Sequence, residues 1–114
     1  MKRQFLLAFL ASPAMADTPL VTAAMATPFG DGWTISVTLS HPDTGWDHYA
    51  DGWEVLAGDG QSLGLRPLLH PHEQEQPFTR TLQVDEPIPN GAVVRARCNR
   101  DGWGAATFVL DVKP

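Results

Sequence analysis

Three features of the sequence predict an all-β protein. Short apolar runs are separated by Gly, Pro and Asp turns at intervals of about ten residues, which is typical of β-sandwiches and small barrels. Several runs alternate apolar and polar side chains, as strands with one buried face do. Helical periodicity is almost absent. We therefore predict an immunoglobulin-like or fibronectin-like β-sandwich of about seven strands, with a small β-barrel as the alternative.

The start of the chain has the pattern of a secretory signal peptide. Lys2 and Arg3 precede an apolar run over residues 5–11, and Ala14-Met15-Ala16 forms a small-x-small cleavage site. The run is far shorter than the roughly 20 apolar residues of a membrane-spanning helix, so we expect no membrane insertion. We predict that residues 1–16 are cleaved after Ala16 and that the protein is periplasmic or secreted. Residues 17–114 are long enough for a single domain.

The strands are predicted, in order, over residues 20–28, 33–40, 53–58, 62–69, 78–84, 92–99 and 105–112. The second has the clearest pattern, because apolar side chains from Trp33 to Leu39 alternate with Thr and Ser after a tight Gly-Asp-Gly turn. The fourth contains Pro67, which cannot donate a hydrogen bond to a neighbouring strand, so we place this strand at a sheet edge.

The last three predicted strands each have one apolar face. In the fifth, Arg80 is in phase with the inward-facing residues, and we expect its guanidinium to meet a carboxylate from the loop 41–52, namely that of Asp43, Asp47 or Asp51. In the sixth, Cys98 points to the buried side, where a free cysteine behaves as a small hydrophobe. In the seventh, alternate apolar residues from Ala106 to Val112 share a face.

The tripeptide Asp-Gly-Trp occurs at 31–33, 51–53 and 101–103. The spacings are unequal, so these copies do not form a tandem repeat. We interpret each as an Asp-Gly turn followed by a Trp that opens the next strand or caps the core.

Charge and cysteine content exclude several classes of partner. Removal of residues 1–16 leaves six basic and 13 acidic residues, a formal charge of −7 with His neutral. Nucleic acid requires a basic face, and an anionic lipid surface is disfavoured for the same reason. A metal ion or other cationic ligand would be attracted. The single cysteine permits no internal disulfide bond.

The chemically active residues are concentrated in alternate loops. Connections after the first, third and fifth predicted strands are turn-like, whereas 41–52, 70–77 and 100–104 contain all four His residues and several acidic and aromatic ones. Alternate connections of a β-sandwich emerge at the same end. We therefore expect these three loops to converge.

Imidazole and carboxylate groups in these loops are candidate metal ligands. His70-Pro71-His72 places two imidazoles on an extended segment, and donors from the loop 41–52 would complete a set suited to Zn²⁺ or Cu²⁺. No compact ligand motif is present, and the alternative is that the His side chains only form hydrogen bonds and pack the loops. The candidate ligands are His41, His48, His70, His72, Asp43 and Asp47.

Three segments carry a resemblance to known proteins: HPDTGWDHYADGW at 41–53, LLHPHE at 68–73 and QPFTR at 76–80. In these motifs the chain resembles a group of small exported, periplasmic bacterial proteins, and the resemblance covers most of residues 17–114. It implies export and a single compact domain, and it brings no activity, cofactor or catalytic residue.

Three classes of function are compatible with the sequence. The first is a binding module whose loops hold a metal ion or a small polar ligand, and the second is a structural or protein-interaction domain that docks an envelope protein. The third, a small hydrolase, has least support because no nucleophile-base pair is visible, so we do not expect an enzyme. The residues predicted for a ligand or interaction surface are Trp46, Tyr49, Arg80, Asp101 and Trp103.

Overall fold

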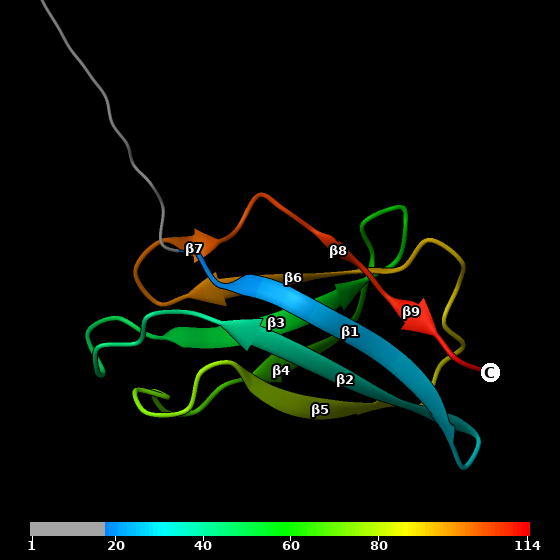
Figure 1. The fold of residues 1–114 in the computed structure, drawn as a ribbon. Helices are drawn as coiled ribbons and strands as arrows, with labels where there is room; N and C mark the ends of the chain where they lie inside the picture. The colour runs from blue at the N-terminus through cyan, green and yellow to red at the C-terminus, as the bar shows by residue number, and fades with distance from the viewer. Residues whose placement is uncertain (1–17) are drawn as a thin grey trace, which may run out of the picture.

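The computed structural model describes residues 18–114, which form two β-sheets packed face to face (Figure 1). The predicted signal peptide lies outside the described residues. Within 18–114 there is no helix, and hence none long and apolar enough to cross a membrane. The strands are β1 (Leu20–Phe29), β2 (Gly32–Ser40), β3 (Ala50–Leu56), β4 (Ser62–Pro67), β5 (Phe78–Val84), β6 (Val93–Cys98), β7 (Gly102–Trp103), β8 (Phe108–Val109) and β9 (Asp111–Val112).

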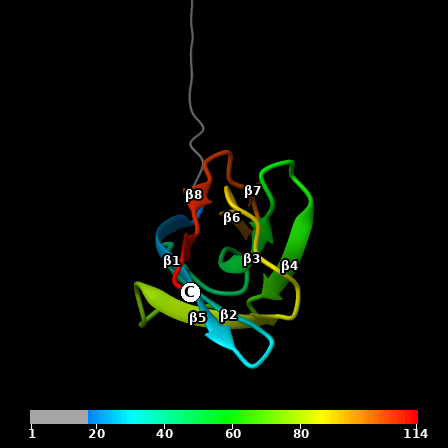
Figure 2. The ribbon, with the colours of Figure 1, turned by 90° about the vertical axis from the view of Figure 1, so that its right-hand side faces the viewer.

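One sheet has the strand order β5-β2-β1-β9, and the other has the order β4-β3-β6-β7 with β8 also paired to β6. Viewed along the strands, β1, β2 and β5 lie on one side of the molecule and β3, β4 and β6 on the other (Figure 2). The predicted all-β sandwich is therefore confirmed, and the sheets do not close into the alternative barrel. Pro67 ends β4 at a sheet edge, as its missing N–H group requires.

The core lies between the two sheets and follows the alternation in the sequence. Ile35, Val37 and Leu39 of β2 are fully buried, and they face the indole of Trp53 and the aliphatic side chains of the opposite sheet. Trp53 is the largest buried side chain among the described residues. Large aromatic and β-branched side chains supply the buried area that a small domain without disulfide bonds needs.

The predicted strand 105–112 is wrong as a single element. Phe108 pairs with Val94 of β6, whereas Asp111 pairs in parallel with Met25 of β1, so the run crosses from one sheet to the other. Between these pairings the Leu110 N–H donates to the carbonyl of Ala92, and the side chain of Leu110 fills the core. The apolar alternation is present, but its residues belong to two sheets. The division into β8 and β9, together with the short strand β7, raises the number of strands from the predicted seven to nine.

The central Asp-Gly-Trp copy is also different from its prediction. Asp51 and Gly52 lie inside β3, which begins at Ala50 and ends at Leu56, and they form no turn. The strand is irregular there, because the register with β6 shifts between Ala50 and Gly52. A β-bulge thus accommodates the residues that local turn propensity assigned to a loop.

Three loops meet at one end of the sandwich, at the left of Figure 1, and we call residues 41–49, 68–77 and 99–101 the loop end. The backbone N–H of His72 donates to Asp43 Oδ2 at 2.7 Å, which joins the first two loops. Arg100 Nη1 lies 3.3 Å from His48 Nδ1, which joins the first and third. The predicted convergence of these loops is confirmed.

Candidate metal centre

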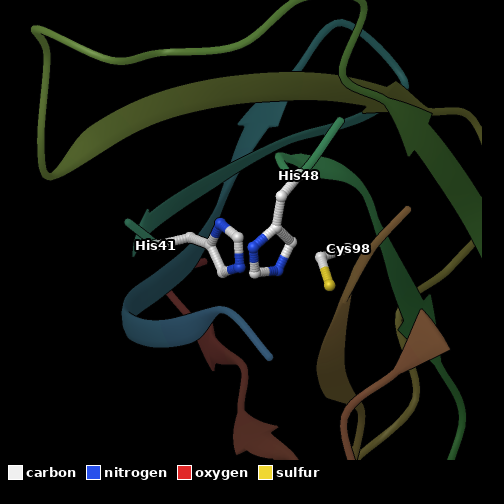
Figure 3. Close-up of side chains that lie close together, drawn as sticks. All are labelled: His41, His48 and Cys98. Carbon is white, nitrogen blue, oxygen red and sulfur yellow. The ribbon is translucent and has the colours of Figure 1, made fainter. Parts of the chain in front are cut away.

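Two imidazoles and a thiol meet in the interior of the loop end (Figure 3). His41 follows β2, His48 precedes β3, and Cys98 is the last residue of β6. All three are buried, and one donor atom from each lies within 4.8 Å of the others. Strands from both sheets therefore deliver three soft or borderline donors to one point.

A buried carboxylate orients the first imidazole. Asp43 Oδ1 lies 2.6 Å from His41 Nδ1, and the Asp43 side chain has no solvent exposure. The same carboxylate accepts the backbone N–H groups of Ala50, at 2.9 Å, and His72, at 2.7 Å. A carboxylate can only accept, so Nδ1 of His41 holds a proton.

The other nitrogen of His41 has no hydrogen-bond partner. Nε2 is buried and unpartnered within the described residues. In the neutral ring the single N–H proton is on Nδ1, which donates it in a hydrogen bond to Asp43, so Nε2 carries a lone pair. Metal-binding imidazoles in proteins have this arrangement: one ring nitrogen donates its N–H to a carboxylate, and the other nitrogen coordinates the metal.

His48 packs edge-on against His41, with ring centroids 4.7 Å apart and planes at 87°. Arg100 Nη1 lies 3.3 Å from its Nδ1, and a guanidinium can only donate, so Nδ1 accepts and the proton of the neutral ring is on Nε2. That Nε2 is also buried and, in the part of the chain that the structure describes, has no hydrogen-bond partner. Coordination through Nε2 requires this proton to leave and Arg100 to move away from Nδ1.

The Cys98 sulfur has two contacts with Asp101. The backbone N–H of Asp101 donates to Sγ at 3.2 Å, and the thiol donates to Asp101 Oδ2 at 3.6 Å. The same carboxylate oxygen is 3.7 Å from His48 Nε2, and the Asp101 side chain is 36% exposed. Asp101 thus lies at the partly exposed edge of the cluster, beside two of its three donor atoms.

The spacing of the donors allows coordination after a small contraction. Bonds of about 2.0 to 2.3 Å to nitrogen and sulfur place tetrahedral ligand atoms about 3.5 Å apart. The present separations reach 4.8 Å, so binding would draw the side chains together by about 1 Å.

The structure brings together only some of the predicted ligands. His41 and His48 belong to the cluster and Asp43 supports it, but Asp47 is exposed on its loop. His72 is buried beside the cluster, with its ring stacked on Phe78 at a centroid distance of 3.9 Å. His70 is exposed, and its ring centroid lies 4.5 Å from that of His72.

The pKa of the His72 imidazole lies below its ordinary value. Burial disfavours the charged ring, and the charges of Arg80 and His70 lower the pKa further against the opposing effects of Glu75 and Asp43. His72 is therefore held neutral to lower pH than a free imidazole.

The predicted partner of Arg80 is wrong. Its Nη2 lies 3.2 Å from Glu75 Oε1 and 2.8 Å from His72 Nε2, both on the loop that precedes β5. That loop folds back over its own strand and supplies the counter-charge locally. The expected carboxylates are engaged elsewhere or exposed: Asp43 binds backbone N–H groups, and Asp51 pairs with Arg97 at 2.9 Å.

The aromatic residues of the predicted surface have different environments. Trp46 is 66% exposed and leans edge-on against Tyr49, with centroids 5.6 Å apart. The ring of Trp103 is half-buried, with the guanidinium of Arg95 at 4.2 Å and that of Arg97 at 5.4 Å from its centroid. Trp46 presents a free ring to solvent, whereas Trp103 packs under two cations.

Cys98 is the cluster residue that the sequence analysis did not include among the ligands. Its inward phase was predicted correctly, and it is fully buried. Its position in the sequence could have identified it as a candidate ligand, because it is the last inward-facing residue of a strand that ends at the loop end. Pairing of Ala50 with Cys98 across β3 and β6 then places the thiol close to His48.

Comparisons with known proteins give one relative with a descriptive name. The chain is 35% identical over 102 residues to a Halomicrobium mukohataei protein described as a "Putative lipoprotein". The match covers 87% of this chain and 49% of the relative, so the chain spans about half the length of the protein that it matches. No family model matches the chain, and no solved structure matches it.

Proposed function

We propose that this protein is an exported, envelope-associated module that binds one transition-metal ion, Zn²⁺ or Cu²⁺, through His41, His48 and Cys98. The observation that carries the proposal is the buried, unpartnered Nε2 of His41, whose ring is held by Asp43 and which faces a second imidazole and a thiol. A buried polar atom without a partner costs free energy, and a metal ion would satisfy it. Asp101 is the proposed fourth ligand.

The choice of metal follows from the donor atoms. Two imidazole nitrogens and a thiolate suit Zn²⁺ and copper far better than the hard ions Ca²⁺ and Mg²⁺, which prefer oxygen ligands. A set of two His and one Cys with a weaker additional ligand also occurs in copper sites. Binding must release the thiol proton, so the affinity is expected to rise with pH.

Two observations support export to the envelope. The first 16 residues have the signal-peptide pattern, and the relative in Halomicrobium mukohataei is described as a lipoprotein. Fractionation of expressing cells, followed by N-terminal sequencing, tests this part. Recovery of the uncleaved chain from the cytoplasm would contradict it.

Metal titration of the purified protein tests the binding. Calorimetry with Zn²⁺ and absorption spectra with Cu²⁺ or Co²⁺ should show one site, with a sulfur-to-metal charge-transfer band that Cys98→Ser removes. His41→Ala should lose binding, whereas the matched control His70→Ala should keep it because His70 is exposed and outside the cluster. Binding that survives His41→Ala but is lost in the His70→Ala/His72→Ala double variant would refute the assignment of ligands.

An interaction domain is the second candidate function, and exposed side chains at the loop end favour it. Trp46 is 66% and Leu69 is 73% exposed. Exposed aromatic residues are frequent anchors in protein interfaces. Crosslinking in the intact envelope with a photoreactive amino acid at position 46 would test it, and position 59, in the turn after β3, is the control at the opposite end.

A further inference from the structure

A second candidate site lies outside the metal cluster, in a small hollow between the loop 68–77 and strands β4 and β5. Its volume is about 110 Å³, which is below the roughly 300–1,000 Å³ of pockets for drug-sized ligands. It is lined by Arg66, Leu68, Leu69, His70, His72 and Arg80. Two guanidinium groups and two imidazoles thus face one space, and none of the six lining residues is acidic.

The two guanidinium groups are held in place by backbone carbonyls. Arg66 Nε donates to the carbonyl of Thr81 at 2.8 Å, and its Nη1 donates to the carbonyl of Pro67. Arg80 Nη1 donates to the carbonyl of Thr79 at 2.7 Å. A guanidinium has five N–H donors, so these contacts fix its plane and leave donors free. These carbonyls are neutral, so they do not offset the positive charge of either guanidinium.

Among residues 18–114, only one carboxylate forms an ion pair with either of these cations. Glu75 pairs with Arg80 at 3.2 Å, but its side chain is 58% exposed, and exposed ion pairs typically contribute only about 0 to 1 kcal/mol. Within residues 18–114, Arg66 has no ion-pair partner. An incoming anion therefore meets one unpaired guanidinium and one that is weakly paired.

The titration of His72 supports the same conclusion. After burial, the charges of Arg80 and His70 are the main causes that lower its pKa, and they outweigh the carboxylates of Glu75 and Asp43. Arg80 and His70 thus act on this ring more strongly than the two carboxylates do, although the full chain has a formal charge of −5. A bound anion would reverse the effect and raise the pKa of His72.

We propose that this hollow binds a single small oxyanion, such as inorganic phosphate or a carboxylate group, between Arg66 and Arg80. Guanidinium groups bind the oxygens of planar carboxylates and tetrahedral phosphates through paired, charge-assisted hydrogen bonds. His70 stands at the exposed side of the hollow and can add a further contact. The site shares no residue with the metal cluster, so either proposal can fail without the other.

Titration of the metal-free protein with inorganic phosphate tests the proposal, with acetate as a parallel probe and ionic strength held constant by NaCl. NMR spectra should show saturable shifts of the Arg66 and Arg80 Nε–H signals and a higher pKa for the His72 ring. If phosphate saturates and acetate does not, the ligand is a phosphate. The reverse result identifies a carboxylate ligand.

Charge variants distinguish specific binding at this hollow from a nonspecific ionic effect of the added anion. Arg66→Gln should weaken binding by roughly tenfold or more, because charge-assisted hydrogen bonds are lost. Lys113→Gln, an exposed cation at the chain terminus, should have no effect. Glu75→Gln should strengthen binding by releasing Arg80, and it keeps the proposal testable if Arg66→Gln fails to fold. Non-saturating shifts, or equal effects of the Arg66 and Lys113 variants, would overturn the proposal.

Discussion

Asp43 is the residue on which the geometry of the loop end depends most. Its carboxylate accepts hydrogen bonds from the His41 ring and from two backbone N–H groups of separate segments, and it is fully buried. It therefore positions His41 and also ties the loop 68–77 to the loop 41–49. A carboxylate with this many contacts is a positioning group more than a metal ligand.

We expect Asp43→Asn to weaken Zn²⁺ binding by about 10- to 100-fold, because the amide cannot match the carboxylate as an acceptor for His41. The variant should also lose roughly 1 to 3 kcal/mol of unfolding free energy through impaired buried hydrogen bonds. Calorimetry and urea unfolding measure the two effects. Asp47→Asn is the control, since this exposed residue of the same loop should change neither quantity.

Arg100 opposes metal binding at the same site. Its guanidinium donates to His48 Nδ1 and so places a positive charge next to a proposed ligand. We expect Arg100→Ala to raise Zn²⁺ affinity by roughly 3- to 10-fold, because it removes this repulsion and frees Nδ1 to hold the ring proton. Lys113→Ala removes the same charge far from the cluster and should have little effect. Weaker binding in Arg100→Ala would show that the ring needs Arg100 for its orientation.

At the scale of the elements, Gly32 shows how closely β2 approaches β5. A Cβ atom at this position would lie 2.4 Å from the carbonyl oxygen of Val84 and 3.0 Å from the Cα atom of Asp85. Both are backbone atoms, so relief of the clash requires the strands to separate. The Gly of the first Asp-Gly-Trp copy is thus required by strand packing in addition to the turn before it.

We expect Gly32→Ala to lower the unfolding free energy by about 1 to 3 kcal/mol, the typical cost of overpacking. Gly58→Ala is the matched control, because its Cβ would meet only the carbonyl of Gly91 at an ordinary 3.7 Å. Chemical denaturation of both variants measures the difference. Equal stability of the two would mean that β2 and β5 separate at little cost.

At the scale of the whole molecule, two shifted groups predict lower stability in acid. His72 has a pKa below its usual 6.5, so the unfolded chain takes up this proton first as the pH falls. The free energy of unfolding should therefore decrease below about pH 6.5 until the pKa of the folded state is passed.

Glu54 adds a second decrease at lower pH. Burial alone would raise the pKa of Glu54, but hydrogen bonds with Ser62 and Arg95 and the charge of Arg95 outweigh it and lower the pKa from 4.5. The stability that its carboxylate contributes is present above pH 4.5 and is lost as the pH falls through the lower folded value.

Urea unfolding from pH 8 down to a pH below the folded pKa of Glu54 measures both decreases. His72→Gln should flatten the upper part of the profile near pH 6 and leave the lower part unchanged. Glu54→Gln should flatten only the lower part. A profile of His72→Gln that matches the wild type over the whole range would contradict the assignment of the upper decrease to His72.

The fold class, and the end of the sandwich at which the His and acidic side chains lie, could be predicted from the sequence. Alternation from Trp33 to Leu39 and from Val94 to Cys98 depends only on which neighbours face the core, so it could be read locally. The position of Pro67 at an edge follows from its missing donor, and the convergence of alternate loops follows from antiparallel connection.

Tertiary structure decided which groups meet within that end. The pairing of Ala50 with Cys98 brings the thiol to His48 across 50 residues of sequence, and no local pattern specifies this register. The loop 68–77 folds onto β5, so Arg80 forms its ion pair with Glu75 of that loop. The run 105–112 is divided because it crosses from one sheet to the other. Periodicity specifies the face on which a side chain lies, whereas its partners depend on register and loop path, which are set by the packing of the whole chain.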